Sequence, residues 1–132
     1  EFDDATMKEV TLNMPLYSEV DKLYIGLDMD AAVEAPTPYK IRKPFVSYGS
    51  SITQGACASR PGMVWGNIIR RVLQHPVINL GFSGNGLGEL AIAEHIASLN
   101  PSVFVMDYDY NAPTMAHLEA THEPFFKIIR KY

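Results

Sequence analysis

A serine in a glycine-rich segment is the strongest chemical feature of this sequence. Ser51 lies within residues 48–55, YGSSITQG, directly after the apolar run 45–48. A serine exposed at such a turn can act as a nucleophile, with neighbouring backbone N–H groups facing the same point. Because a serine hydroxyl is a poor nucleophile at neutral pH, this chemistry also needs a base, usually a histidine. The motif alone fits a polar turn and helix cap equally well.

Two later segments have the composition of an oxyanion-binding site. Residues 79–86 read NLGFSGNG, and their glycines let a backbone N–H approach a developing oxyanion without an intervening Cβ. A phosphate-binding nucleotide loop is a weaker alternative, because the opening Gly-x-Gly of the dinucleotide fingerprint is missing. Residues 107–111 read DYDYN, and the carboxamide of Asn111 can donate to an oxyanion. Alone, an asparagine before Ala-Pro more often forms a turn or begins a helix.

The segments around these loops predict an α/β fold with a parallel sheet. Continuous apolar runs predict three strands, the last of them buried on both faces: 45–48, 76–80 and 103–106. Helical spacing and capping residues predict helices over 63–73 and 87–97 and a third that begins after Thr114. Strands that alternate with helices form parallel sheets, whose ligands bind beyond the carboxyl ends of the strands. We therefore expect one site formed by three loops: 49–62, 81–87 and 107–114.

The first part of the chain has a different pattern. Residues 9–12 and 22–27 predict short strands, and the proline-rich residues 34–39 predict a connector. Three strands make a thin sheet for an α/β domain. We therefore expect a fragment of a longer polypeptide, with the end of a small β-domain and its connector in residues 1–38 and a truncated α/β domain in residues 39–132.

Together and in this order, the three loops resemble the catalytic blocks of the SGNH (GDSL-type) hydrolases. This resemblance implies a three-layer αβα, flavodoxin-like fold, here partial, preceded by the small β-domain found in some bacterial members. It also implies that Ser51 is the nucleophile and that the Ser51 N–H, the Gly84 N–H and the Asn111 side chain bind the oxyanion. Ser50 stands where the family usually has aspartate. The register with Gly49 and Thr53 favours Ser51 over Ser50 as the nucleophile.

The catalytic base of that family lies in an Asp-x-x-His motif, which this sequence does not contain. The resemblance therefore places the catalytic histidine and aspartate outside this chain, so we expect the chain itself to have little activity. Four histidines of this sequence are candidates to replace the missing catalytic base: His75, His95, His117 and His122. His75 precedes a strand and so lies at the wrong end of the sheet, and structural or surface roles are favoured for all four. His122 is the least implausible contributor among them.

Other residues near the loops have ordinary structural explanations. Trp65 and Met63 are expected in the core, Arg60 at the surface, and Cys57 as a small packing residue, since nothing beside it in the sequence would activate its thiol. The single cysteine excludes a disulfide framework and a Cys-based zinc site, and five residues separate His117 from His122, which is not a helical ligand pair. We therefore expect neither a metal nor a cofactor.

The overall composition limits the kinds of partner that we expect this chain to bind. The net charge is −4, and no basic run is long enough to neutralise phosphates, so nucleic acid is not expected. No apolar run is long enough to span a bilayer. The oligomeric state and the compartment are left open.

We expect a serine ester hydrolase acting on acyl or acetyl esters, with carbohydrate esters as one class. The alternative is a non-catalytic sugar- or nucleotide-binding module on the same scaffold.

Overall fold

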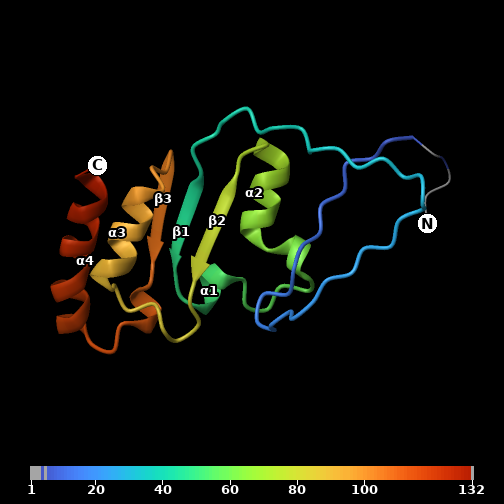
Figure 1. Cartoon of the computed structure of the whole chain (residues 1–132). Helices are drawn as coiled ribbons and strands as arrows, with labels where there is room; N and C mark the ends of the chain where they lie inside the picture. The colour runs from blue at the N-terminus through green and yellow to red at the C-terminus, as the bar shows by residue number, and fades with distance from the viewer. Residues whose placement is uncertain (1–3, 5, 132) are drawn as a thin grey trace.

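The computed structural model describes residue 4 and residues 6–131 (Figure 1). The elements in chain order are β1 (Phe45–Gly49), α1 (Ser51–Gln54), η1 (Pro61–Met63), α2 (Trp65–Leu73), β2 (Val77–Gly81), α3 (Leu90–Ser98), β3 (Val103–Asp107), η2 (Asp109–Asn111) and α4 (Met115–Arg130). Thr114 caps α4 as expected, since its hydroxyl accepts from the N–H of His117 at 3.1 Å.

The three strands form one parallel sheet in the order β2-β1-β3. Gly49 at the end of β1 lies opposite Gly81 of β2 and opposite Asp107 of β3. All three strands therefore end at the same level, and the loops that follow them leave from one edge of the sheet, at the bottom of Figure 1. The predicted parallel sheet is confirmed.

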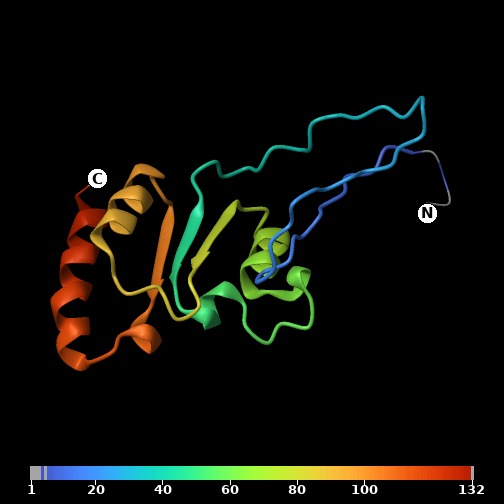
Figure 2. The same cartoon turned by 60° about the horizontal axis from the view of Figure 1, so that its bottom comes forward.

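Helices cover both faces of this sheet, with α2 on one side and α3 and α4 on the other (Figures 1 and 2). Alternate residues of β1 pack against the helices on the two faces of the sheet, because successive side chains in a strand point in opposite directions. Phe45 meets Trp65 of α2 edge-on, with ring centroids 6.0 Å apart. On the opposite side, β1, α3, α4 and the residue after β3 share a core of fully buried residues: Val46, Tyr48, Ala93, Ile96, Tyr108 and Phe125. The arrangement is an α/β fold in which helices flank a three-strand parallel sheet.

The expectation that β3 is buried on both faces is wrong. Val103 is 42% exposed and Val105 39% exposed, whereas Phe104 and Met106 pack against the core. The reason is that β3 is an edge strand of the described sheet and that α2 packs against β2 at the other edge. A continuous apolar run cannot distinguish these two environments.

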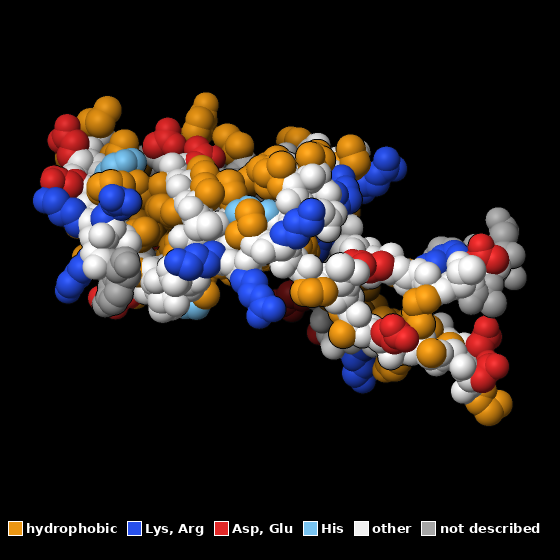
Figure 3. Space-filling model, turned by 90° about the horizontal axis from the view of Figure 1, so that it is seen from above, with side chains coloured by type: hydrophobic (Ala, Val, Ile, Leu, Met, Phe, Trp, Pro, Cys, Tyr) orange, Lys and Arg blue, Asp and Glu red, His pale blue; other side chains and the backbone are white. Residues whose placement is uncertain are grey.

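The predicted strands at 9–12 and 22–27 are also wrong, because neither segment is a strand in the structure. Residues 6–44 instead form an extended arm that projects from the α/β unit (Figures 1 and 2). Its apolar side chains are exposed, for example Val10 at 70% and Ile25 at 70%, and Figure 3 shows them mixed with charged ones. A strand needs a hydrogen-bonded neighbour and a face to bury, and the arm has neither here. Assignment of residues 1–38 to a β-domain stays a prediction.

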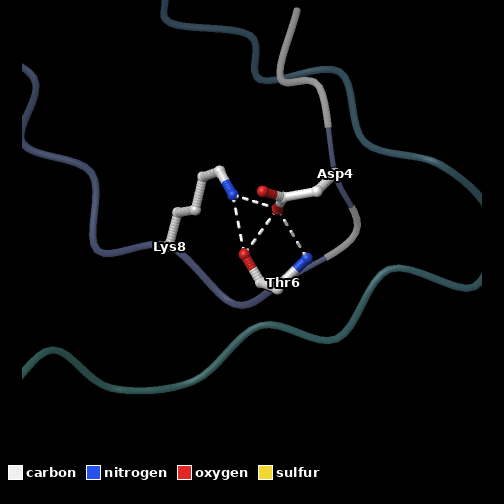
Figure 4. A network of polar contacts seen from close by, with 3 residues as sticks. All are labelled: Asp4, Thr6 and Lys8. Atoms are coloured by element: carbon white, nitrogen blue, oxygen red, sulfur yellow. Dashed lines mark hydrogen bonds and ion pairs between the residues drawn. The ribbon is translucent and has the colours of Figure 1, made fainter.

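The beginning of the arm contains a network of local contacts. Lys8 forms an ion pair with Asp4, and its ammonium also donates to the Thr6 hydroxyl at 2.8 Å (Figure 4). The hydrogen bond from Lys8 lowers the pKa of Asp4, with help from Thr6. All three residues of this network lie within one short stretch of chain.

Candidate active site

The structure distinguishes between the two adjacent serines. Ser50 is 1% exposed, and its hydroxyl accepts from the N–H of Ile52 at 3.2 Å as the N-cap of α1. Ser51 is the first residue of α1 and is partly exposed. Within the described residues, neither its hydroxyl nor its N–H has a hydrogen-bond partner. Of the two hydroxyls, the one of Ser51 is therefore free to react.

A set of buried contacts fixes the short helix α1 beside the ends of the other two strands. The N–H of Ser50 donates to the carbonyl of Asp107 at 3.1 Å, and the Thr53 hydroxyl donates to the Asp107 carboxylate at 2.9 Å. On the other side, the Asn79 side chain donates to the carbonyl of Thr53 at 2.7 Å, and the Trp65 indole donates to the same oxygen at 3.2 Å. Four residues is too short a helix to be stable alone, so these contacts hold Ser51 in place.

Residues 82–88 between β2 and α3 form a loop whose backbone donors are nearly all used. Each N–H in this stretch has a recorded acceptor except that of Gly84. The acceptors include the carbonyl of Gly49, the side chain of Gln54 and the hydroxyl of Tyr48. Gly84 has φ +69°, a left-handed conformation that favours glycine, and a Cβ there would meet no atom within 4 Å. Among the described residues, its N–H is the one backbone N–H of this loop without an acceptor.

Asn111 lies where its loop meets the loop 82–88. Its side-chain amide donates to the carbonyl of Phe82 at 3.0 Å and to that of Gly86 at 3.2 Å. Both amide hydrogens therefore have acceptors in this structure. The contact joins the loops after β2 and β3, and the expected role in binding an oxyanion requires Asn111 to exchange or share one of these hydrogen bonds.

Tyr48 and Glu89 hold the far end of the same loop. The Tyr48 hydroxyl donates to the Glu89 carboxylate at 2.6 Å and accepts from the N–H of Gly88 at 2.7 Å. The other Glu89 oxygen accepts from the N–H of Leu87 at 3.1 Å. Burial, followed by the hydrogen bond to Glu89, raises the pKa of Tyr48 well above its ordinary value of 10. Sequence reasoning missed this pair, because a tyrosine in a strand carries no signal of its hydroxyl's partner.

Tyr48→Phe is expected to destabilise the chain at neutral pH by about 1–3 kcal/mol, because it leaves the buried N–H of Gly88 without an acceptor. The pKa of Tyr48 is higher in the folded state than in the unfolded state. The stabilisation from Tyr48 is therefore complete below the ordinary tyrosine pKa and declines as the pH rises above it. Urea unfolding at about pH 9 and about pH 11 should show a steeper loss in the wild type than in Tyr48→Phe. Equal losses would contradict the assignment.

The structure places none of the four histidines in contact with Ser51. His75 is 6% exposed, and its Nε2 contacts the carbonyl of Lys43 at 2.8 Å and the Ser102 hydroxyl at 2.9 Å. His95 lies on α3 and is exposed. His117 reaches the carbonyl of Leu87 through its Nε2 at 2.7 Å. His122 stacks on Tyr108 with ring centroids 6.0 Å apart.

The remaining residues singled out in the sequence lie around the rim of the loops. Arg60 and Cys57 are exposed, and Met63 is 45% exposed, so the expectation that it belongs to the core is wrong. It ends the single-turn η1 and does not lie on α2, which explains its exposure. Within the described part of the chain, no group of three or more His, Cys, Asp or Glu side chains is arranged to hold a metal ion. No helix in that part is long and apolar enough to cross a bilayer.

Comparison with known proteins agrees with this geometry. A profile of the GDSL-like lipase/acylhydrolase family matches residues 42–132, so the chain belongs to that family. The crystal structure of a Bacteroides ovatus protein assigned as a GDSL-like lipase is similar, with 36% sequence identity and a TM-score of 0.67. The match covers 74% of this chain and 28% of that protein. No curated protein matches the sequence.

Proposed function

We propose that this chain provides the nucleophile and the oxyanion-binding part of a serine ester hydrolase. In this mechanism Ser51 attacks the carbonyl carbon of an ester, and the alcohol leaves as an acyl-serine forms. Water then releases the acid. The base is a histidine other than the four in these residues, oriented by an aspartate, and neither of these two lies in this chain. The chain spans about a quarter of the matched structure, so the activity belongs to the complete native polypeptide that contains these residues.

The observation that supports this proposal most directly is the pair of free backbone donors at the sheet edge where the free Ser51 hydroxyl also lies. The N–H groups of Ser51 and Gly84 lack partners within the described residues, and both follow strands that end at the same level of the sheet. Donors that are fixed before the reaction stabilise a developing oxyanion at little reorganisation cost. Asn111 would join them by releasing the longer of its contacts, the one to Gly86 at 3.2 Å.

Acyl and acetyl esters are the proposed substrates, and carbohydrate acetyl esters are the class to test first. No histidine, aspartate or glutamate of the described residues forms a hydrogen bond with the Ser51 hydroxyl, and we propose that other residues of the native polypeptide complete the substrate site. The alternative function, a binding module for sugars or nucleotides, would use the same loops without forming an acyl-serine.

Labelling with a fluorophosphonate tests the proposal. In the complete native polypeptide, the probe is expected to attach to Ser51, because an activated serine attacks phosphorus as it attacks an ester carbonyl. Peptide mapping by mass spectrometry identifies the labelled residue, and Ser50→Ala is the matched control that should still label. Absence of labelling in a folded protein, or labelling of Ser50, would contradict the proposal, and absence would favour the binding module.

A further inference from the structure

One part of the arm is not free of the α/β unit. Residues 13–17, which we call the strap, pass beside α1 and α2. The Tyr17 hydroxyl donates to the carbonyl of Ser51 at 3.0 Å. The same carbonyl accepts from the N–H groups of Gly55 at 3.1 Å and Ala56 at 2.9 Å. The strap therefore contacts the backbone of the proposed nucleophile.

Gln54, the last residue of α1, connects the strap to the loop that contains Gly84. Its side-chain nitrogen donates to the carbonyl of Leu16 at 2.8 Å, and its side-chain oxygen accepts from the N–H of Ser83 at 2.8 Å. These two partners fix the orientation of the amide, because a carbonyl can only accept and an N–H can only donate. Ser83 immediately precedes Gly84, so a fixed Ser83 N–H restricts the peptide that carries the free donor.

Other contacts of the strap hold it at this position. Arg70 of α2 donates to the side chain of Asn13 at 3.0 Å. Leu16 lies so close to Gly55 that a Cβ at this glycine would be 3.1 Å from a Leu16 methyl group. Asn13 and Leu16 are half-buried, in contrast to most of the arm. Pro15 and Leu16 also line a cavity of about 240 Å³ beside Gln54, Asn79 and Gly81.

We propose that the strap is a positioning element of the active site, and that Tyr17 and Gln54 are the positioning residues through which it acts. The inference rests on the proposed ester hydrolase function. Tyr17 restrains the carbonyl of Ser51, and Gln54 links the strap to Ser83 beside Gly84. Neither side chain touches the reacting atoms. Both set the distance and orientation between the hydroxyl that attacks and the N–H that receives the negative charge.

Three variants separate the parts of this connection. Gln54→Leu removes both hydrogen bonds of the Gln54 side chain, the one to Leu16 and the one to Ser83. Gln54→Glu keeps an oxygen for the Ser83 N–H but turns the donor that faces the Leu16 carbonyl into an acceptor, so it breaks only the contact with the strap. Tyr17→Phe removes only the hydrogen bond to Ser51. Tyr24→Phe is the matched control, because Tyr24 lies on the same arm and is 83% exposed.

Steady-state kinetics on an acetate ester, with the complete native polypeptide, give the first measurement. We expect Gln54→Leu to lower kcat by about 10–100-fold with KM within about twofold, since small displacements of reacting groups act on the transition state. Gln54→Glu and Tyr17→Phe should lower kcat by about 3–10-fold, and Tyr24→Phe should match the wild type. Thermal unfolding midpoints confirm that each variant is folded.

Amide hydrogen exchange in the present chain gives a measurement that does not depend on catalysis. The Ser83 amide is expected to exchange at least about tenfold faster in Gln54→Leu than in the wild type, and to stay protected in Gln54→Glu. Wild-type kcat in both Gln54→Leu and Tyr17→Phe would overturn the strap proposal, and so would unchanged exchange at Ser83 in Gln54→Leu. Turnover that survives Ser51→Ala would instead overturn the proposed function, while the exchange result would still test the link through Gln54.

Discussion

Ser51→Ala in the complete native polypeptide is expected to lower kcat for an acetate ester by about 10⁴-fold or more, because in the proposed mechanism the acyl-enzyme forms on the Ser51 hydroxyl. KM should change little, since the hydroxyl adds little to ground-state binding. Stability should also change little, because the Ser51 hydroxyl is partly exposed and has no partner within the described residues. Release of p-nitrophenol from its acetate ester measures the first effect, and urea unfolding measures the second.

Ser50→Ala is the control for this prediction and should behave in the opposite way. The Ser50 hydroxyl caps α1 through the N–H of Ile52, so its loss should cost about 0.5–2 kcal/mol of stability. Activity should remain within about tenfold of the wild type. If Ser50→Ala lost most of its turnover while Ser51→Ala stayed active, Ser50 and not Ser51 would be the nucleophile.

Gly81→Ala is expected to destabilise the chain by about 3–5 kcal/mol, the range of severe overpacking and backbone strain. A methyl group at this position would overlap the backbone of Gln54 and would lie 2.7 Å from the carbonyl carbon of Thr53. Backbone atoms cannot rotate away as a flexible side chain can, so either β2 or α1 must move. Because α1 contains Ser51, such a movement would also disturb the proposed site. Urea unfolding followed by circular dichroism measures the loss of stability.

Gly26→Ala is the matched control for the substitution at Gly81. Gly26 lies on the exposed arm, and a Cβ there would meet no atom within 4 Å. Its effect on the free energy of unfolding should lie within about 0.5 kcal/mol of zero. If Gly81→Ala were as well tolerated as Gly26→Ala, the close approach of β2 and α1 would be refuted.

The sheet and its loops could be predicted because their signals are local. Each strand is a short apolar run followed by a residue that favours turns, and the helices between them have clear periodicity. Parallel strands with helical crossovers then place the three loops at one edge without further information. The loops at Ser51, Gly84 and Asn111 were found in this way. Their chemical roles still depend on the proposed mechanism.

The misplaced elements depend on neighbours that a local pattern does not describe. Residues 9–12 and 22–27 have strand-like composition but no strand beside them in the structure. Val103 and Val105 are as apolar as buried residues, yet they lie on an edge strand. Whether a segment has a partner is a property of the whole fold.

The contacts that hold the loops of the site in place could not be predicted from the sequence, for the same reason. Thr53 and Asp107 are 54 positions apart, and Gln54 and Leu16 are 38 positions apart. Nothing in either residue's immediate sequence indicates its partner. The register that aligns Gly49 with Asp107 brings Thr53 to its partner, whereas the path of the strap brings Leu16 to Gln54.

The alignment of three strand ends also determines when the proposed site can come into existence during protein synthesis. Ser50 has its N–H partner on Asp107, which the ribosome adds 57 residues later. Until β3 has left the exit tunnel, β1 lacks a neighbour on that side, and the turn at Ser51 lacks its two hydrogen bonds to Asp107. Contacts between distant positions form late, because closing a long loop of chain costs conformational entropy before the contacts that offset this cost have formed. We therefore expect the turn at Ser51 to gain its last restraints only when the third strand has docked.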